Sequence, residues 1–275
     1  MVKKVGWFWL LFAAGMLVFF VGGYWTGLPA GPRLAVKVGM PAVLLVSTLI
    51  LRRRETLRPR YRVSLAFLAA SGALLAGWLV SDPLLRLTGL SANSVPGVAV
   101  AKCADALPIV VAAFLIARWG GLTRRDMYLQ RGNLWVWLTV GLISFAGFTV
   151  FFLVQAQDQN IGTDRLLALA PWTLLFIFAN AFMEEFHFRG LLLRPFADLI
   201  GRFPANLCIA LFFTLGHAPV QYTPDIVPFL AVLFLLALAW GYLIQKTEAL
   251  WGAVLFHAGA DLLIIIGIYQ TYGVN

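Results

Sequence analysis

The chain has 275 residues, of which 61% are hydrophobic and 12% are charged. Apolar runs of about 20 residues recur along its whole length, which excludes a soluble globular domain and is typical of helices that cross a membrane. The formal charge of +9 is concentrated in short loops between these runs, where Lys and Arg set membrane topology, so it does not indicate a nucleic-acid-binding protein. The two cysteines, Cys103 and Cys208, both lie in apolar runs and indicate neither a disulfide scaffold nor a cysteine metal site.

The first five apolar segments carry no motif to which we assign a role. They cover approximately residues 5–27, 34–51, 63–80, 97–118 and 134–154. The first is too long for a signal-peptide core and lacks a small-residue cleavage site, so we expect an uncleaved span. The most basic stretch of the chain, residues 52–62, follows the second segment. We interpret it as a topology anchor on anionic headgroups, with a specific lipid site as the alternative.

Two charged residues interrupt the fourth segment. Lys102 and Asp105 are three positions apart and therefore lie on one helical face. We expect them to pair within the helix, and contact with a substrate or docking to another helix is the alternative.

The C-terminal part of the chain holds the remaining apolar segments. The sixth begins near residue 166 and continues to a glycine-proline breaker, and the later ones cover approximately residues 204–217, 226–245 and 250–269, with a turn at 218–225. The chain is therefore predicted to be an all-α, polytopic transmembrane helical bundle of eight or nine spans. Alternation through nine spans collects the basic stretches on one side, which places the N-terminus in the cytoplasm and the C-terminus outside.

An ionisable cluster, Glu184, Glu185, His187 and Arg189, lies inside the sixth segment. Ionisable side chains are costly in hydrocarbon, so such a cluster indicates a functional site. Glu185 and Arg189 are four positions apart and can form an ion pair on one helix face. Glu184 points about 100° away, where this spacing offers no cation. We therefore interpret Glu184 as the candidate general base and Glu185 as the structural partner of Arg189.

The other two histidines lie at a matching depth. Glu185 lies about 16 residues before the breaker and His217 about 16 after it, so an antiparallel pair rising ~1.5 Å per residue places them at a similar height. His257 and Asp261 are four apart on one face of the last segment. We expect Glu184, His217 and His257 to converge on one pocket. Each histidine taken alone also fits a packed side chain or a helix-to-helix hydrogen bond.

Three motifs in this region resemble those of a known family. They are Glu184-Glu185-x-x-x-Arg189, Phe213-x-x-x-His217 and His257-x-x-x-Asp261, accompanied by Phe188-Arg189-Gly190-Leu191-Leu192 and Ala249-Leu250-Trp251-Gly252-Ala253. The set resembles the CPBP or ABI family of CAAX-processing and bacteriocin-processing intramembrane proteases, which includes the type II CAAX prenyl proteases. The resemblance covers approximately residues 170–267. We divide the chain accordingly into spans of unassigned role, 1–165, and a CPBP-like catalytic core, 166–275.

The resemblance implies an intramembrane endopeptidase that hydrolyses peptide bonds of membrane-associated proteins or peptides. It implies that Glu184 and His217 activate a water and that His257 stabilises the oxyanion. Glu185 and Arg189 would hold the site or the peptide backbone. No Ser or Cys stands beside a histidine in these segments, which disfavours a covalent nucleophile.

The chain departs from the family at one motif position. Asp261 stands where the family commonly has Asn, and it would act with His257 either directly or through a bound water. An ionised carboxylate cannot donate a hydrogen bond as an amide does, so a role for Asp261 in holding an oxyanion requires its protonated form.

A metal ion is the open question of the sequence. Glu184, His217 and His257 would supply three ligands and leave a position for water, as catalytic zinc prefers. The His-Glu-x-x-His motif is absent, and Glu184-x-x-His187 is only half of a di-iron carboxylate site. We treat His187 as accessory and favour metal-free glutamate catalysis, with zinc as the alternative and no other cofactor.

The rival hypothesis is a non-catalytic membrane protein, such as a transporter or an immunity or scaffold factor, that uses the same polar cluster. A transporter is expected to show an internal repeat of broken helices, and no convincing repeat is found. The expected partners are membrane lipids and a membrane-associated substrate, without nucleic acid. Basic inner loops and the lack of an organellar signal favour a prokaryotic plasma membrane. Prenylated proteins, leader peptides and a membrane-bound regulator are all open as substrates.

Overall fold

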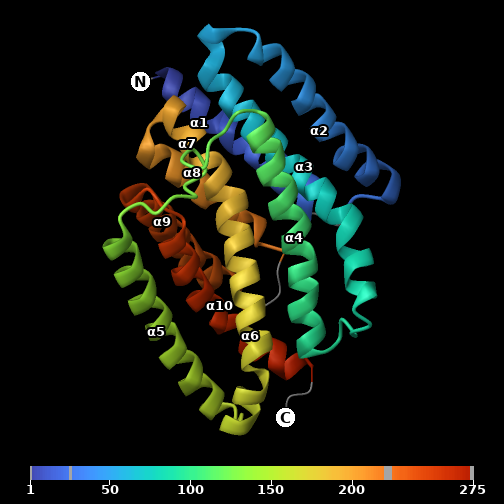
Figure 1. Ribbon diagram of the computed structural model, residues 1–275, viewed down its shortest axis with the longest axis vertical. Helices are drawn as coiled ribbons and strands as arrows, with labels where there is room; N and C mark the ends of the chain where they lie inside the picture. Colours follow the sequence, from blue (N-terminus) through green and yellow to red (C-terminus); the bar gives the residue numbers. More distant parts are fainter. Residues whose placement is uncertain (1, 25–26, 220–224, 273–275) are drawn as a thin grey trace.

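The computed structural model describes residues 2–24, 27–219 and 225–272, which are mostly helical and contain no strand. In chain order the elements are α1 (Val2–Gly15), a π-helical stretch η1 (Met16–Tyr24), α2 (Ala30–Arg52), η2 (Glu55–Leu57), α3 (Arg58–Leu87), α4 (Val95–Trp119), α5 (Leu134–Asp158), α6 (Thr163–Glu184), a π-helical turn η3 (Glu185–Gly190), α7 (Leu191–Ile200), α8 (Arg202–Gly216), α9 (Ile226–Thr247) and α10 (Trp251–Thr271). Most run along the long axis of the bundle, and α1 begins at the end opposite to that where α10 ends (Figure 1).

Eight helices of the described residues are long and apolar enough to cross a membrane. They are Lys3–Gly23, Ala30–Arg52, Glu55–Leu87, Val95–Trp119, Leu134–Asp158, Thr163–Ile200, Ile226–Thr247 and Trp251–Thr271. The prediction of an all-α transmembrane bundle with eight or nine spans is therefore confirmed, and the number is eight.

The seventh predicted segment is not a full span. It corresponds to α8, which has 15 residues and measures about 22 Å, less than the ~30 Å hydrocarbon core of a bilayer. The helix ends at Gly216, and Pro219 follows within three residues, where its ring cannot continue a helix. The predicted turn at 218–225 lies in part outside the described residues, which omit 220–224.

The spans differ in how much of their surface the protein buries. α3 and α10 are the most enclosed, whereas α2 and α5 bury little and lie at opposite edges of the bundle (Figure 1). Side chains such as Val43 on α2 and Ile143 on α5 are about 70% exposed, as expected for a lipid-facing surface. The buried core therefore runs along α3 and α10 and includes the π turn η3, where every residue is buried.

Glycines allow α10 to pack closely on α5. A Cβ on Gly252 would lie 2.7 Å from Cβ of Trp137, and one on Gly259 would lie 2.9 Å from Cα of Phe145. Such distances leave no room for any side chain, so the two backbones approach as in other membrane helix pairs that use small residues. This contact fixes α10, which carries two of the predicted site residues.

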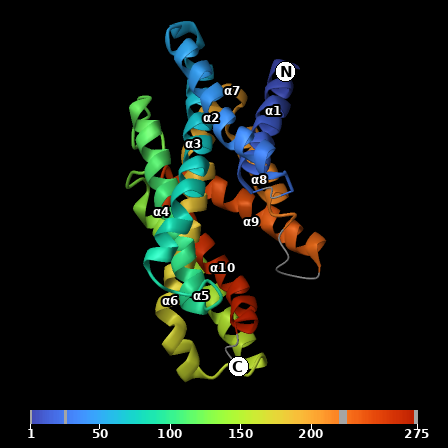
Figure 2. The same ribbon diagram turned by 90° about the vertical axis from the view of Figure 1, so that its right-hand side faces the viewer.

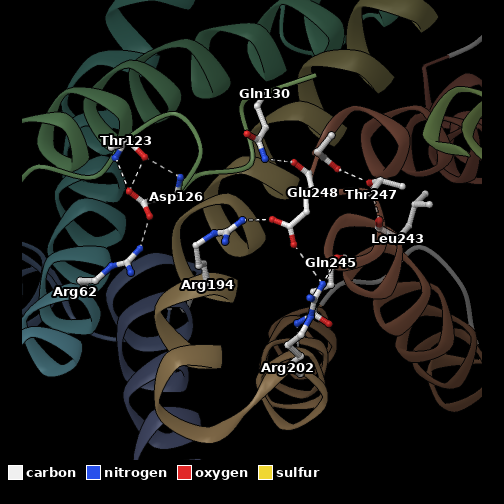
Figure 3. A network of polar contacts seen from close by, with 11 residues as sticks. Arg62, Thr123, Asp126, Gln130, Arg194, Arg202, Leu243, Gln245, Thr247 and Glu248 are labelled. Carbon is white, nitrogen blue, oxygen red and sulfur yellow. Dashed lines mark hydrogen bonds and ion pairs between the residues drawn. The ribbon is translucent and has the colours of Figure 1, made fainter. Parts of the chain in front are cut away.

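A polar network joins three loops at the end of the bundle where α7 and α8 meet (Figure 3). The carboxylate of Glu248, between α9 and α10, accepts hydrogen bonds from Arg194 of α7 and Arg202 of α8. Its backbone oxygen accepts a 2.9 Å hydrogen bond from the side chain of Gln130. The chain reversals α7–α8 and α9–α10 are thereby held at the same level.

A second part of the network ties α3 to the same end. The guanidinium of Arg62 pairs with Asp126, in the loop after α4, and at 2.8 Å with Asp198 of α7. Burial acts to raise the pKa of the Asp126 carboxyl, but hydrogen bonds from Thr123 and the charge of Arg62 outweigh it and lower the pKa below its usual value. The carboxylate is therefore ionised at neutral pH and available for this contact.

We expect Glu248→Gln to lower the unfolding temperature in detergent by about 2 °C, because Arg194 and Arg202 lose a partly exposed ion pair worth about 1 kcal/mol. The matched control is Glu55→Gln, since Glu55 is exposed and forms no ion pair within the described residues. An equal loss in both variants, or none in either, would contradict the structural role of Glu248.

Candidate functional site

The acidic pair lies where α6 changes into the π turn η3. Glu184 is the last residue of α6 and Glu185 the first of η3. Spacing alone predicted a regular helix here, and the wider π turn is a difference, of a kind that occurs often at functional sites. The predicted ion pair is nevertheless formed, with Nη1 of Arg189 2.7 Å from Oε1 of Glu185 and both side chains fully buried.

The buried guanidinium of Arg189 has further partners on neighbouring helices. It lies 4.7 Å from the ring centroid of Phe213 and 5.3 Å from that of Trp240. It also donates a 3.3 Å hydrogen bond to the backbone oxygen of Ala237 on α9. A desolvated cation is stabilised by aromatic faces and by a carboxylate at this distance. Arg189 therefore links η3 to α8 and α9.

His257 of α10 shares the same carboxylate oxygen. Its Nδ1 lies 2.8 Å from Oε1 of Glu185, and because a carboxylate accepts, we assign the proton to Nδ1. Its Nε2 faces Oε2 of Glu184 at 3.6 Å and Oδ1 of Asp261 at 3.4 Å. The indole of Trp240 stacks on the ring with centroids 3.9 Å apart and planes 8° apart. These contacts hold the imidazole in one orientation.

Asp261 is held by an amide that the sequence analysis did not assign to the site. Nδ2 of Asn180 donates a 3.0 Å hydrogen bond to Oδ2 of Asp261. Asn180 precedes Glu184 by four positions and so lies on the same face of α6, one turn away. That spacing is the signal by which Asn180 could have been found. Trp240 gave no such signal, because it stands in an apolar segment rich in large side chains.

Glu184 and His217 have polar atoms without a hydrogen-bond partner among the described residues. Nδ1 of His217, at the end of α8, donates a 2.8 Å hydrogen bond to the backbone oxygen of Phe213. Its Nε2 has no hydrogen-bond partner within the described part of the chain. The carboxylate of Glu184 likewise accepts no hydrogen bond from any described residue. Both groups are therefore available to a molecule between them.

These groups line a cavity of about 470 Å³. It is lined by Glu184, His217 and His257, which the sequence predicted to converge, and by Asp261 and Asn180. The remaining wall is largely apolar and comes from α9 and the second half of α10. Glu185 and Arg189 lie behind the wall of this cavity and do not line it. The catalytic roles of all these residues stay predictions.

Three other ionisable residues noted in the sequence, His187, Lys102 and Asp105, have different surroundings. Nε2 of His187 lies 3.0 Å from the backbone oxygen of Ala70 on α3, away from the cavity. Lys102 and Asp105 form no ion pair within the described structure, so the predicted pairing is wrong. Their side chains leave the helix about 60° apart. Lys102 turns towards α6 and lines the cavity, whereas Asp105 is exposed.

The alternative metal site is not assembled from these residues. Among the described residues, no three His, Cys, Asp or Glu side chains are placed to hold one ion. Nδ1 of His257 is bonded to Glu185 and Nδ1 of His217 to a backbone oxygen, so only Nε2 of each ring is left as a possible ligand. As placed, Glu184, His217 and His257 do not surround one point as the ligands of a tetrahedral zinc ion do.

We expect Arg189→Met to cost about 3–5 kcal/mol of stability, because Glu185 keeps a buried charge without its guanidinium. Adding Glu185→Gln to the same chain should recover much of that loss. Denaturation in mixed micelles of the two single variants and the double variant measures the coupling. Arg124→Met, at an exposed position, is the control. Strictly additive losses would show that the ion pair does not matter.

A family model described as type II CAAX prenyl endopeptidase Rce1-like matches residues 166–263. The match extends from α6 into α10 and contains all three motifs of the cavity and the buried ion pair. It falls within the core predicted at 166–275 and leaves residues 1–165 outside. Neither a curated protein nor a solved structure matches the chain.

Proposed function

We propose that this chain, whose residues 166–263 belong to the Rce1-like family of type II CAAX prenyl endopeptidases, cleaves membrane-associated substrates with a water activated by Glu184 and His217. The family match and the eight apolar helices of the described residues support an integral membrane endopeptidase. The observation that carries the mechanism is which polar atoms at the site have a hydrogen-bond partner and which do not. Among the described residues, neither Glu184 nor Nε2 of His217 has a hydrogen-bond partner, and Oε2 of Glu184 lies 3.6 Å from Nε2 of His257. Glu185 and Nδ1 of His257 are instead bonded to each other.

Glu184 acts as the general base in this mechanism. It takes one proton of the water while the water oxygen attacks the peptide carbonyl carbon, and Nε2 of His217 orients the same water. The resulting tetrahedral intermediate breaks its carbon–nitrogen bond, and the proton held by Glu184 passes to the leaving amine. No group of the protein becomes covalently attached. The apolar wall of the cavity strengthens each electrostatic contact because it keeps bulk water away.

The oxyanion is stabilised by two donors that line the same cavity. Nε2 of His257, which lies 3.6 Å from a Glu184 oxygen and 3.4 Å from an Asp261 oxygen, supplies one when the ring carries a proton on both nitrogens. The second amide hydrogen of Asn180 supplies another. Asp261 accepts from Asn180 at 3.0 Å, so it positions this amide and needs no proton of its own. The departure from the family at Asp261 is thereby compensated by Asn180.

Glu185 and Arg189 support the site from behind. Because neither lines the cavity, they do not contact the peptide. Glu185 orients His257 through the 2.8 Å hydrogen bond, and Arg189 balances the charge of Glu185. The resemblance implied that Glu185 and Arg189 hold either the site or the peptide backbone, and this arrangement supports the first role.

The basic stretches support a membrane orientation. Residues 52–62 and 118–131 lie at the end of the bundle where α1 begins (Figure 2), and positively charged loops face the cytoplasm. We assign this end to the cytoplasmic side of a prokaryotic plasma membrane, with the N-terminus inside.

We expect Glu184→Ala and His217→Ala each to lower cleavage of a membrane-peptide library by at least about 10²-fold, as loss of general acid–base catalysis predicts. A strong chelator should leave wild-type cleavage unchanged. His187→Gln is the matched control, because the new amide still reaches the oxygen of Ala70 and His187 lies outside the cavity. Mass spectrometry of the products measures cleavage and maps the cut sites.

Two results would contradict this function. Cleavage that is lost with chelator and restored by zinc would make His217 and His257 metal ligands. Equal cleavage by the wild type, Glu184→Ala and His217→Ala would contradict the protease function. It would favour a binding or transport role for the same polar cluster.

A further inference from the structure

The proposed mechanism leaves one charged residue of the cavity unused. Lys102 of α4 is the one Lys or Arg among the described residues that line it. Its ammonium lies 5.6 Å from the ring centroid of Phe176 on α6. No carboxylate of a described residue is within ion-pair distance of it. A cation in a membrane helix is costly and usually has a partner.

Lys37 of α2 shows how the same fold satisfies a lysine that has a purely structural role. Its ammonium donates to the backbone oxygens of Gly22 and Gly23 at 3.2 Å and 3.3 Å. Lys102 has no such hydrogen bonds in the described structure. Its side chain is directed at α6 and the cavity, so its natural partner is a molecule in the cavity.

The position of Lys102 sets the distance to the reacting bond. Phe176, beneath the ammonium, and Glu184 are eight positions apart on α6, which is about 12 Å along the helix. An extended peptide covers this distance in three to four residues at ~3.3 Å each. The cavity wall next to this path is apolar and includes Leu233 and Ile264, which suits apolar side chains in between.

We propose that Lys102 is an anion subsite that binds a carboxylate of the substrate three or four residues from the scissile bond. The carboxylate belongs either to the end of the peptide chain or to an Asp or Glu side chain. A charge-assisted hydrogen bond in a largely apolar cavity discriminates strongly against a neutral group at the same place. This inference rests on the proposed protease function and adds a specificity-determining residue to it.

The test uses peptides cleaved by the wild type at mapped sites. Each peptide is made in three forms that differ three or four residues from the cut: a free terminal carboxylate, its amide, and a Glu in a longer, amidated chain. The wild type should cleave a carboxylate form about 10- to 100-fold better than the amide, mainly through KM. The carboxylate form that is cleaved better than the amide shows whether a chain terminus or a Glu side chain supplies the charge.

Variants of Lys102 separate recognition from folding. Lys102→Met should lower kcat/KM for the carboxylate form about 10- to 100-fold more than for the neutral amide and so abolish the preference, and Lys102→Arg should keep part of the preference. Lys246→Met, at an exposed position outside the cavity, should behave as the wild type. Cleavage of the neutral amide also reports that each variant is folded.

Two results would overturn the subsite. One is a wild type that cleaves the carboxylate and amide forms equally. The other is a Lys102→Met variant that loses the same factor on charged and neutral peptides, as a structural role predicts. A wild type that cleaves no peptide at all would instead overturn the protease function, and the subsite with it.

Discussion

The site depends on one carboxylate that the fold buries completely. Oε1 of Glu185 receives both the guanidinium of Arg189 and the ring of His257, at 2.7 Å and 2.8 Å. Charges in a low-dielectric interior persist only when they are paired and hydrogen-bonded. Glu185 therefore ties η3 to α10, and Arg189 extends the link to α9 through Ala237. Its neighbour Glu184 is left to face the cavity.

Two adjacent acids thus take different tasks because a helical turn points them in different directions. The positions of the helices that carry them are fixed in part at the end of the bundle where α7 and α8 meet. There, Glu248 and Arg62 hold the chain reversals through contacts with α7. The position of α10 is also fixed by its close contact with α5 at Gly252 and Gly259. The polar groups meet because several elements are fixed independently.

Much of this arrangement follows from local spacing in the sequence. The membrane spans follow from the length of the apolar runs, and the Glu185–Arg189 pair follows from four-residue spacing. The meeting of Glu184, His217 and His257 follows from equal distances along the chain on either side of a reversal. In each case the regular rise and rotation per residue of a helix decide the geometry.

The remaining features depend on how one helix is rotated against another, which periodicity does not determine. Trp240 lies on His257 because α9 turns that face towards α10. Lys102 faces the cavity, rather than Asp105, because of the way α4 packs on α6. The π turn at Glu185 is a shift of backbone hydrogen bonds without a residue signature.

The most direct test compares Glu184→Gln with Glu185→Gln, measuring peptide cleavage and thermal unfolding on the same purified samples. Both changes remove one carboxylate from neighbouring positions and keep the side-chain shape. We expect Glu184→Gln to keep its unfolding temperature and lose cleavage, whereas Glu185→Gln should unfold at a lower temperature. A Glu184→Gln variant that cleaves as the wild type does would contradict the claim that Glu184 is the base.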